Sequence, residues 1–81
     1  MNKQDLLKRI VVNPKVMVGK PTIRGLRITV SHILSALANK ISVDDILEDY
    51  PELEFDDIRA VLIYAGNLVN EEQVFVVGAR R

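Results

Sequence analysis

The sequence contains no cysteine and only one histidine, and these shortages exclude several kinds of site. Without cysteine there can be neither a disulfide framework nor a thiolate metal site. With His32 alone, no second imidazole is present to complete a metal set or a nucleophile–base pair. His32 lies one position off an apolar stripe, which favours a hydrogen-bonded surface imidazole. We therefore expect no catalytic residue, no metal and no cofactor, and we predict that the chain is not an enzyme.

Long apolar runs are missing as well. No stretch approaches the roughly 20 apolar residues that a membrane-spanning helix needs, and residues 1–9 lack the apolar core of a signal peptide. Residues 19–22 (Gly-Lys-Pro-Thr) lack the second glycine of a phosphate-binding loop. We therefore expect a cytoplasmic protein with no membrane contact and no small-molecule ligand.

With 81 residues, the chain is long enough for one domain, which we place at residues 1–81. A single core of this size supplies only about 3–5 kcal/mol of stability, and here no cross-link adds to it. Association with another chain is the remaining source of stability. We therefore predict a homodimer, in which apolar edge strands at residues 10–12 and 73–77 are covered.

The first third of the chain has the pattern of strands and turns. Residues 1–9 fit a short polar helix or a frayed arm. Residues 10–12 are β-rich, and residues 16–18 form a second short apolar run. Alternation on both sides of Arg24-Gly25 then predicts a hairpin whose strands are residues 22–23 and 26–29. We assign residues 10–29 as a β-hairpin region.

From residue 30 the apolar period becomes helical, and residues 30–70 predict a three-helix core. Thr29 or Ser31 can cap the first helix, and Ser42 can cap the second, which Pro51 ends. The expected apolar stripes contain Val30, Ile33, Leu34, Leu37, Ala38 and Ile41; Val43, Ile46, Leu47 and Tyr50; and Phe55, Ile58, Val61, Leu62, Ala65, Leu68 and Val69. Residues 71–81 read as a short C-terminal strand or tail. The predicted fold class is α+β, mainly α, with a homeodomain-like or helix-turn-helix core.

The net charge of zero conceals an uneven distribution. Residues 1–40 carry eight basic side chains and one acidic one, a net of +7, whereas residues 41–81 carry three basic and ten acidic ones, a net of −7. Two interpretations are open: two surfaces of opposite sign that bind different partners, or two halves that neutralise each other within the fold or across a dimer.

The candidate nucleic-acid-binding residues are basic. Lys15, Lys20, Arg24 and Arg27 gather on the predicted hairpin, where they could contact phosphates. Arg59 is the one basic residue that fits a recognition helix. The first turn of that helix is acidic, which argues against groove reading by the helix and leaves the hairpin as the main source of positive charge.

The acids between residues 44 and 57 favour a solvated helical surface over a metal site, because neighbouring acids diverge on a helix. The competing interpretation is a docking surface for a basic protein. Its candidate partner-binding residues are Asp44, Asp45, Asp49 and Glu52, together with Val74, Phe75 and Val76 of the apolar C-terminal segment.

Two blocks of sequence resemble a known family, the domain of unknown function 433 family. The first has Asn13-Pro14 and then the pattern G-x-P-x-I-x-G-T-R-I-x-V, seen here as residues 19–30. The second runs from Ile41-Ser42 through Ile46-Leu47 and Tyr50-Pro51-x-Leu53, with Asp57-Ile58-x-Ala60 and Tyr64 behind it. Leu26 departs from the pattern because the family has threonine there.

The resemblance implies a small homeodomain-like or winged-helix-like fold, often dimeric, that is encoded beside a PIN-like ribonuclease and is VapB-like. On this basis the leading hypothesis is a type II antitoxin that binds and neutralises such a toxin, with operator DNA as a further partner that would allow autorepression. A stand-alone helix-turn-helix transcription regulator and a homodimeric interaction module without DNA contact are the alternatives.

Overall fold

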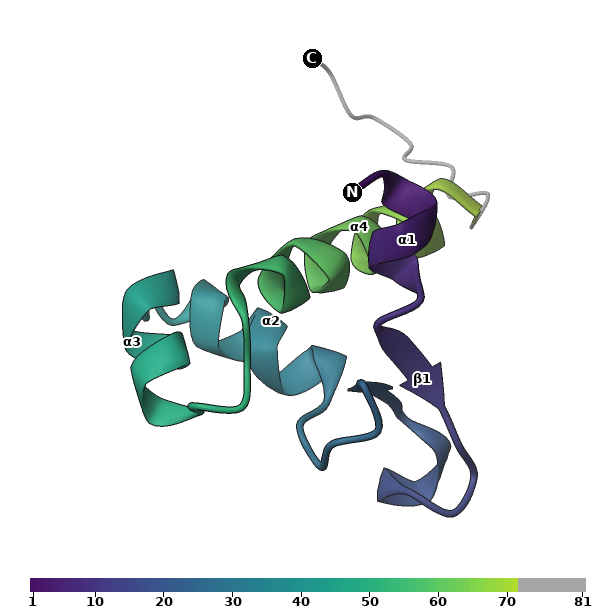
Figure 1. Cartoon of the computed structure of the whole chain (residues 1–81), viewed down its shortest axis with the longest axis horizontal. Helices are drawn as coiled ribbons and strands as arrows, with labels where there is room; N and C mark the ends of the chain where they lie inside the picture. Colours follow the sequence, from purple (N-terminus) through teal and green to yellow (C-terminus); the bar gives the residue numbers. More distant parts are fainter. Residues whose placement is uncertain (72–81) are drawn as a thin grey trace, which may run out of the picture.

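The computed structural model describes residues 1–71, and this part of the chain has an α+β, mainly α, fold. Its elements, in chain order, are α1 (Lys3–Leu7), β1 (Ile10–Val12), the 3-10 turn η1 (Met17–Gly19), β2 (Pro21–Ile23), α2 (Val30–Ala38), α3 (Val43–Asp49) and α4 (Phe55–Glu71). The long helix α4 packs against α1, α2 and α3. In Figure 1, β1 lies below α1; it contacts α4, and β2 contacts α2. The predicted C-terminal strand or tail, with Val74, Phe75 and Val76, lies outside the described residues.

The two strands form one antiparallel pair, with Ile10 opposite Ile23 and Val12 opposite Pro21. The predicted strand pairing, of residues 22–23 with residues 26–29, was therefore wrong. Only one bridge, Thr22 with Thr29, remains of that second pairing. The long connection of residues 13–20 therefore links the strands of the hairpin, and the short turn at Arg24-Gly25 leads into α2.

The second predicted run, residues 16–18, is not a strand. Met17, Val18 and Gly19 all have positive φ, at 52°, 57° and 78°, and form a left-handed turn. Such a conformation is uncommon for a β-branched side chain. Apolar composition alone indicated a strand here, but Val18 is 92% exposed, so no burial supports one.

Arg24 and Gly25 form the tight turn that their sequence indicates. Both have positive φ, at 50° and 77°, the pattern of a type I′ turn, and the Leu26 amide donates to the Ile23 carbonyl at 2.8 Å. Glycine adopts this conformation freely, whereas arginine does so at a cost of about 1–2 kcal/mol. The Arg24 side chain must therefore be held by contacts elsewhere.

Side-chain caps explain where the first three helices begin. The side chains of Asn2, Thr29 and Ser42 accept from the amides of Asp5, His32 and Asp45 and start α1, α2 and α3. The short polar helix, one of two readings of residues 1–9, is the one that forms. Thr29 rather than Ser31 is the cap of α2.

The end of α2 comes earlier than the apolar pattern indicates. Lys40 has a φ of 67°, its amide donates to the Leu37 carbonyl, and the Ile41 amide donates to the Ala36 carbonyl. These two bonds form a Schellman motif, which ends the helix at Ala38. Placing Ile41 on the helical stripe was therefore wrong, and its side chain is 40% exposed.

The core lies where β2 and the last three helices meet, and its buried members are Ile23, Val30, Ile33, Ile46, Leu53, Ile58 and Val61. The stripe predicted for α4 was too wide. Ile58 and Val61 are buried, but Phe55, Leu62, Leu68 and Val69 are exposed. A helix packed on one side buries only part of its circumference, so α4 keeps an outward apolar strip.

Candidate functional site

A buried carboxylate, Asp57, organises the centre of the molecule. Its Oδ1 accepts from Arg9 Nη1 at 2.9 Å and from Arg24 Nε at 3.1 Å, and its Oδ2 accepts from Arg24 Nη2 at 2.9 Å. Arg9 Nη1 also donates to Glu54 Oε1 at 2.7 Å. We call Arg9, Arg24, Glu54 and Asp57 the ion cluster. Asp57 is fully buried, so its interactions are stronger than those of a surface pair.

The ion cluster also begins α4. Asp57 is at the third position of the helix, and its Oδ2 accepts from the Glu54 amide at 2.8 Å, which is half of a capping box. Arg24 Nη2 donates in addition to the Glu52 carbonyl. One carboxylate thus joins the hairpin to the first turn of α4 and holds the left-handed Arg24 in place.

These contacts show which interpretation of the uneven charge applies at the centre. Arg9 and Arg24 belong to the basic half of the chain, and Glu54 and Asp57 belong to the acidic half. Here the halves neutralise each other within the fold. Treating Asp57 as part of a solvated acidic surface was therefore wrong. Arg9 was not singled out in the sequence, where nothing distinguishes it from its neighbour Lys8.

The pKa of Asp57 lies below its ordinary value. Burial alone raises this pKa, but the hydrogen bonds from Arg24, the Glu54 amide and Arg9 outweigh burial and lower it. A depressed carboxyl pKa stabilises the fold at pH values above the unfolded-state pKa of about 3.9, and this stabilisation is lost as the pH falls from that value through the lower pKa of the folded state.

We therefore expect the free energy of unfolding to decline steeply below about pH 4. Urea denaturation of the wild type and of Asp57→Asn between neutral and acid pH checks this, because the difference between them should shrink in acid. Carbon-13 titration of the Asp57 carboxyl in the wild type measures the same effect directly. A difference that is constant with pH, together with an ordinary titration, would contradict the role of Asp57.

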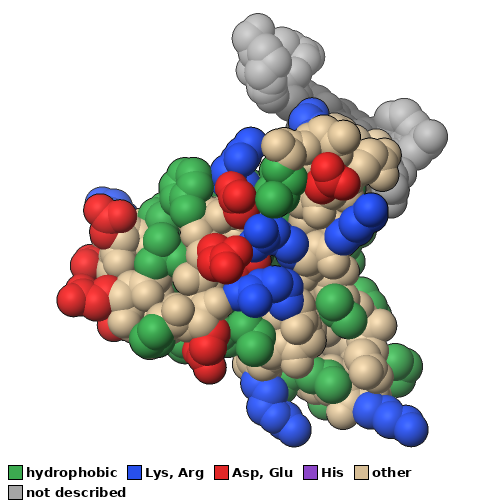
Figure 2. Space-filling model, viewed as in Figure 1, with side chains coloured by type: hydrophobic (Ala, Val, Ile, Leu, Met, Phe, Trp, Pro, Cys, Tyr) green, Lys and Arg blue, Asp and Glu red, His purple; other side chains and the backbone are tan. Residues whose placement is uncertain are grey.

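The basic candidates separate into two groups. Arg24 belongs to the ion cluster, and Arg59 Nη1 pairs with Asp56 Oδ1 at 3.1 Å on the same helix. Lys15, Lys20 and Arg27 are exposed, and none of the three forms an ion pair with a side chain of residues 1–70. We call these three residues the basic loops. Figure 2 shows basic side chains projecting at the hairpin end of the molecule.

Three of the four acidic candidates lie on α3. Asp44, Asp45 and Asp49 are exposed there, together with the further acid Glu48, whereas Ile46 of the same helix is buried in the core. We call these four residues the acidic surface. Glu52 is exposed in the turn that follows, where its backbone carbonyl accepts from Arg24. Figure 2 shows acidic side chains at the α3 end of the molecule, away from the hairpin.

His32 lies beside the acidic surface. Its Nε2 is 2.7 Å from the Tyr50 hydroxyl, and the two rings meet edge to face with centroids 5.6 Å apart. His32, Asp49 and Tyr50 line one hollow of about 300 Å³ between α2 and α3. His32 is exposed, so this pair is a hydrogen-bonded surface contact.

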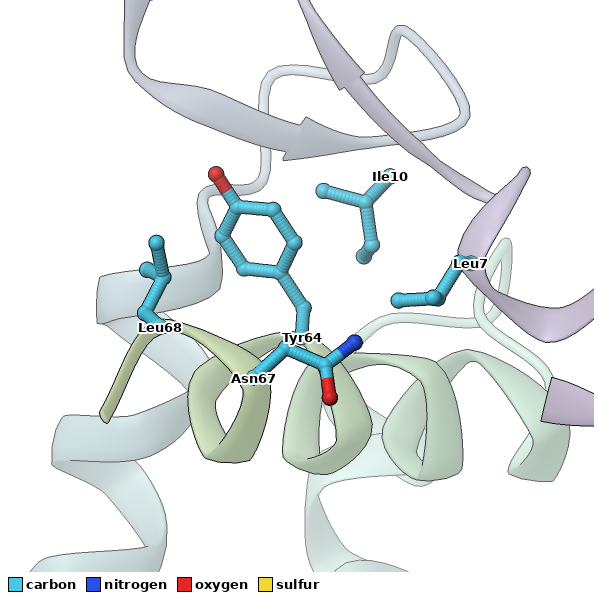
Figure 3. A pocket seen from close by; sticks show the side chains of 5 residues that line it. All are labelled: Leu7, Ile10, Tyr64, Asn67 and Leu68. Atoms are coloured by element: carbon cyan, nitrogen blue, oxygen red, sulfur yellow. The ribbon is translucent and has the colours of Figure 1, made fainter. Parts of the chain in front are cut away.

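Two further hollows flank Tyr64 on the inner side of α4. One, of about 260 Å³, is lined by Leu7, Ile10, Tyr64, Asn67 and Leu68. In Figure 3 the Tyr64 ring projects from α4 between Leu68 and Ile10. The other, of about 350 Å³, shares Tyr64 and Leu68 and has Lys20 at its edge. Both hollows are lined mainly by apolar side chains, so they could accept an apolar side chain but do not resemble a catalytic site.

No group of three His, Cys, Asp or Glu side chains in the part of the chain that the structure describes is placed to hold a metal ion. None of the described helices has the length and apolar character needed to cross a membrane.

These features define a small α+β domain in which an ion cluster joins the hairpin region to the start of α4, and which exposes an acidic surface and basic loops. The chain belongs to the family described as "Protein of unknown function (DUF433)", which matches residues 10–65. The matched segment contains Arg24 and Asp57, so most of the ion cluster lies inside the family's domain.

A curated relative is the "Uncharacterized protein y4eO" of Sinorhizobium fredii, which is 34% identical over 56 residues. That alignment covers 69% of this chain and 25% of the relative. The chain therefore spans about a quarter of the length of the relative that it matches. No solved structure matches the chain.

Proposed function

We propose that this chain is a non-enzymatic, VapB-like antitoxin that binds and neutralises a PIN-like ribonuclease. The observation that carries the proposal is the acidic surface. Its four carboxylates point away from the core, and none of them is paired with a base within the described residues. A ribonuclease that holds RNA phosphates needs a basic cleft, and an unpaired acidic surface complements such a cleft.

The stand-alone transcription regulator is less well supported by the geometry. If α3 or α4 entered a DNA groove, it would present either the acidic surface or the exposed apolar Phe55 and Leu62. Arg59, the one candidate reader on α4, is already paired with Asp56. Operator contact and autorepression are therefore assigned to the basic loops, as a secondary function.

The proposal predicts that removing the charge of the acidic surface releases the toxin. In a variant with Asp44→Asn, Asp45→Asn, Glu48→Gln and Asp49→Asn, we expect affinity for the proposed PIN-like partner to fall at least tenfold. Association should also become less sensitive to salt. Titration calorimetry at two salt concentrations measures both effects.

The matched control changes the basic loops instead, with Lys15→Gln, Lys20→Gln and Arg27→Gln. This control should bind the toxin with wild-type affinity and lose affinity for the DNA upstream of the gene, measured by fluorescence anisotropy. Circular dichroism must first show that both variants are folded, because Asp44 and Asp45 also stabilise the N-terminus of α3. Wild-type affinity of the acidic-surface variant would refute the proposal.

A further inference from the structure

The outward face of α4 carries an apolar strip that nothing in the described chain covers. Phe55, Leu62 and Val69 are 59%, 51% and 66% exposed. Successive members are seven residues apart, which is close to two turns of an α-helix, so the three side chains lie nearly in line along the helix axis. The strip extends for about 21 Å along the helix. It borders the core-facing side of α4, because buried Ile58 lies three positions after Phe55 and four before Leu62.

The strip is self-complementary. The spacing is the same on both sides of Leu62, so a two-fold axis through this residue would bring each Leu62 against its copy. The same axis would set Phe55 of each copy against Val69 of the other, with the helices antiparallel. Gly66 lies beside the strip, and a side chain added there would meet no atom within 4 Å, so a second helix could approach closely at this turn.

Charge distinguishes this face from the other two exposed surfaces. In a two-fold interface each patch meets itself, so a patch of one sign repels its copy. The acidic surface and the basic loops are each of one sign. The α4 face holds one charged pair, Arg59 with Asp56, which neutralises itself, and residues 60–70 contain no charged side chain.

We propose that α4 pairs with α4 of a second copy of this chain, antiparallel and centred on Leu62. The three side chains expose on the order of 300 Å² per copy, and an interface of about 600 Å² falls below the 1,200 Å² of stable complexes. The pair is therefore weak and dependent on concentration, and it leaves the acidic surface and the basic loops open. This inference does not depend on the proposed function.

Two substitutions of single exposed residues test the pairing in the full chain. Sedimentation equilibrium from about 1 µM to 1 mM should show the wild type shifting from one copy to two. Leu62→Glu places two carboxylates on the axis and should weaken association more than tenfold. The control is Val12→Glu on β1, which is also exposed and belongs to the edge strand first expected to form the dimer contact. Val12→Glu should associate like the wild type.

A chemical readout covers the case in which either variant fails to fold. The chain has no cysteine, so Leu62→Cys introduces a single thiol. A short bismaleimide should link two Leu62→Cys chains in high yield, whereas Val18→Cys, in the exposed left-handed turn, should link poorly. A wild type that remains a single copy at 1 mM would overturn the proposal. So would dissociation by Val12→Glu but not by Leu62→Glu, or equal cross-linking of the two cysteine variants.

Discussion

Replacing Asp57 with alanine is expected to lower the free energy of unfolding by about 3 kcal/mol or more, because the change leaves Arg24 without its counter-charge and Arg9 with Glu54 alone. Arg9 is only 17% exposed and cannot recover full hydration in place, whereas Arg24, at 36%, recovers part of it. The change also removes the acceptor of the Glu54 amide and the contact that holds Arg24 in its left-handed conformation.

For a domain of this size, 3 kcal/mol corresponds to a fall in Tm on the order of 15 °C, which thermal unfolding followed by circular dichroism will measure. Asp56→Ala is the matched control, since it changes the same residue type one position away. Its partner Arg59 is exposed, so the expected loss is about 0.5 kcal/mol or less. Similar Tm values for the two variants would show that the ion cluster contributes little to stability.

Ile33→Ala should be comparably damaging through packing alone. Ile33 is fully buried on α2, in the cluster that β2, α3 and α4 complete. Removing its outer carbons leaves a cavity, and such changes cost about 2–5 kcal/mol. Ile41→Ala makes the same chemical change at a side chain that is 40% exposed, just past the end of α2. Urea denaturation should show a loss below about 1 kcal/mol for the control, and equal losses would contradict the assigned core.

Local signals account for most of the fold that could be predicted. The apolar periods of α2, α3 and α4 and the capping residues Thr29 and Ser42 act within one or two turns, so they are readable in the sequence. The errors arose where a more distant contact or a backbone conformation decided the outcome. Residues 10–12 pair with residues 21–23 and not across the turn at Arg24-Gly25. No local sequence pattern indicates this pairing.

The candidate site divides in the same way. The exposure of Asp44, Asp45 and Asp49 follows from the helical period of α3, which buries Ile46. The ion cluster was not predicted, because Arg24 and Asp57 are 33 positions apart and each also fits a solvated role. The sequence did place both residues within the family resemblance, Arg24 in its first block and Asp57 in its second. The order of the two blocks did not indicate that the two side chains are in contact.

The ion cluster has a consequence for how the chain reaches its native state. The contact of Arg9 with Asp57 closes a loop spanning 48 positions, more than half of the chain. Loop closure of this length has an entropic cost that the contact offsets only when both ends are already ordered. A nascent chain that ends before residue 52 therefore contains Arg9 and Arg24 but none of their acceptors in Glu52, Glu54 and Asp57. The contacts of Arg9 and Arg24 with Asp57 can form only after the start of α4 has been synthesised. We therefore expect the hairpin region and the helical core to fold as a single cooperative unit.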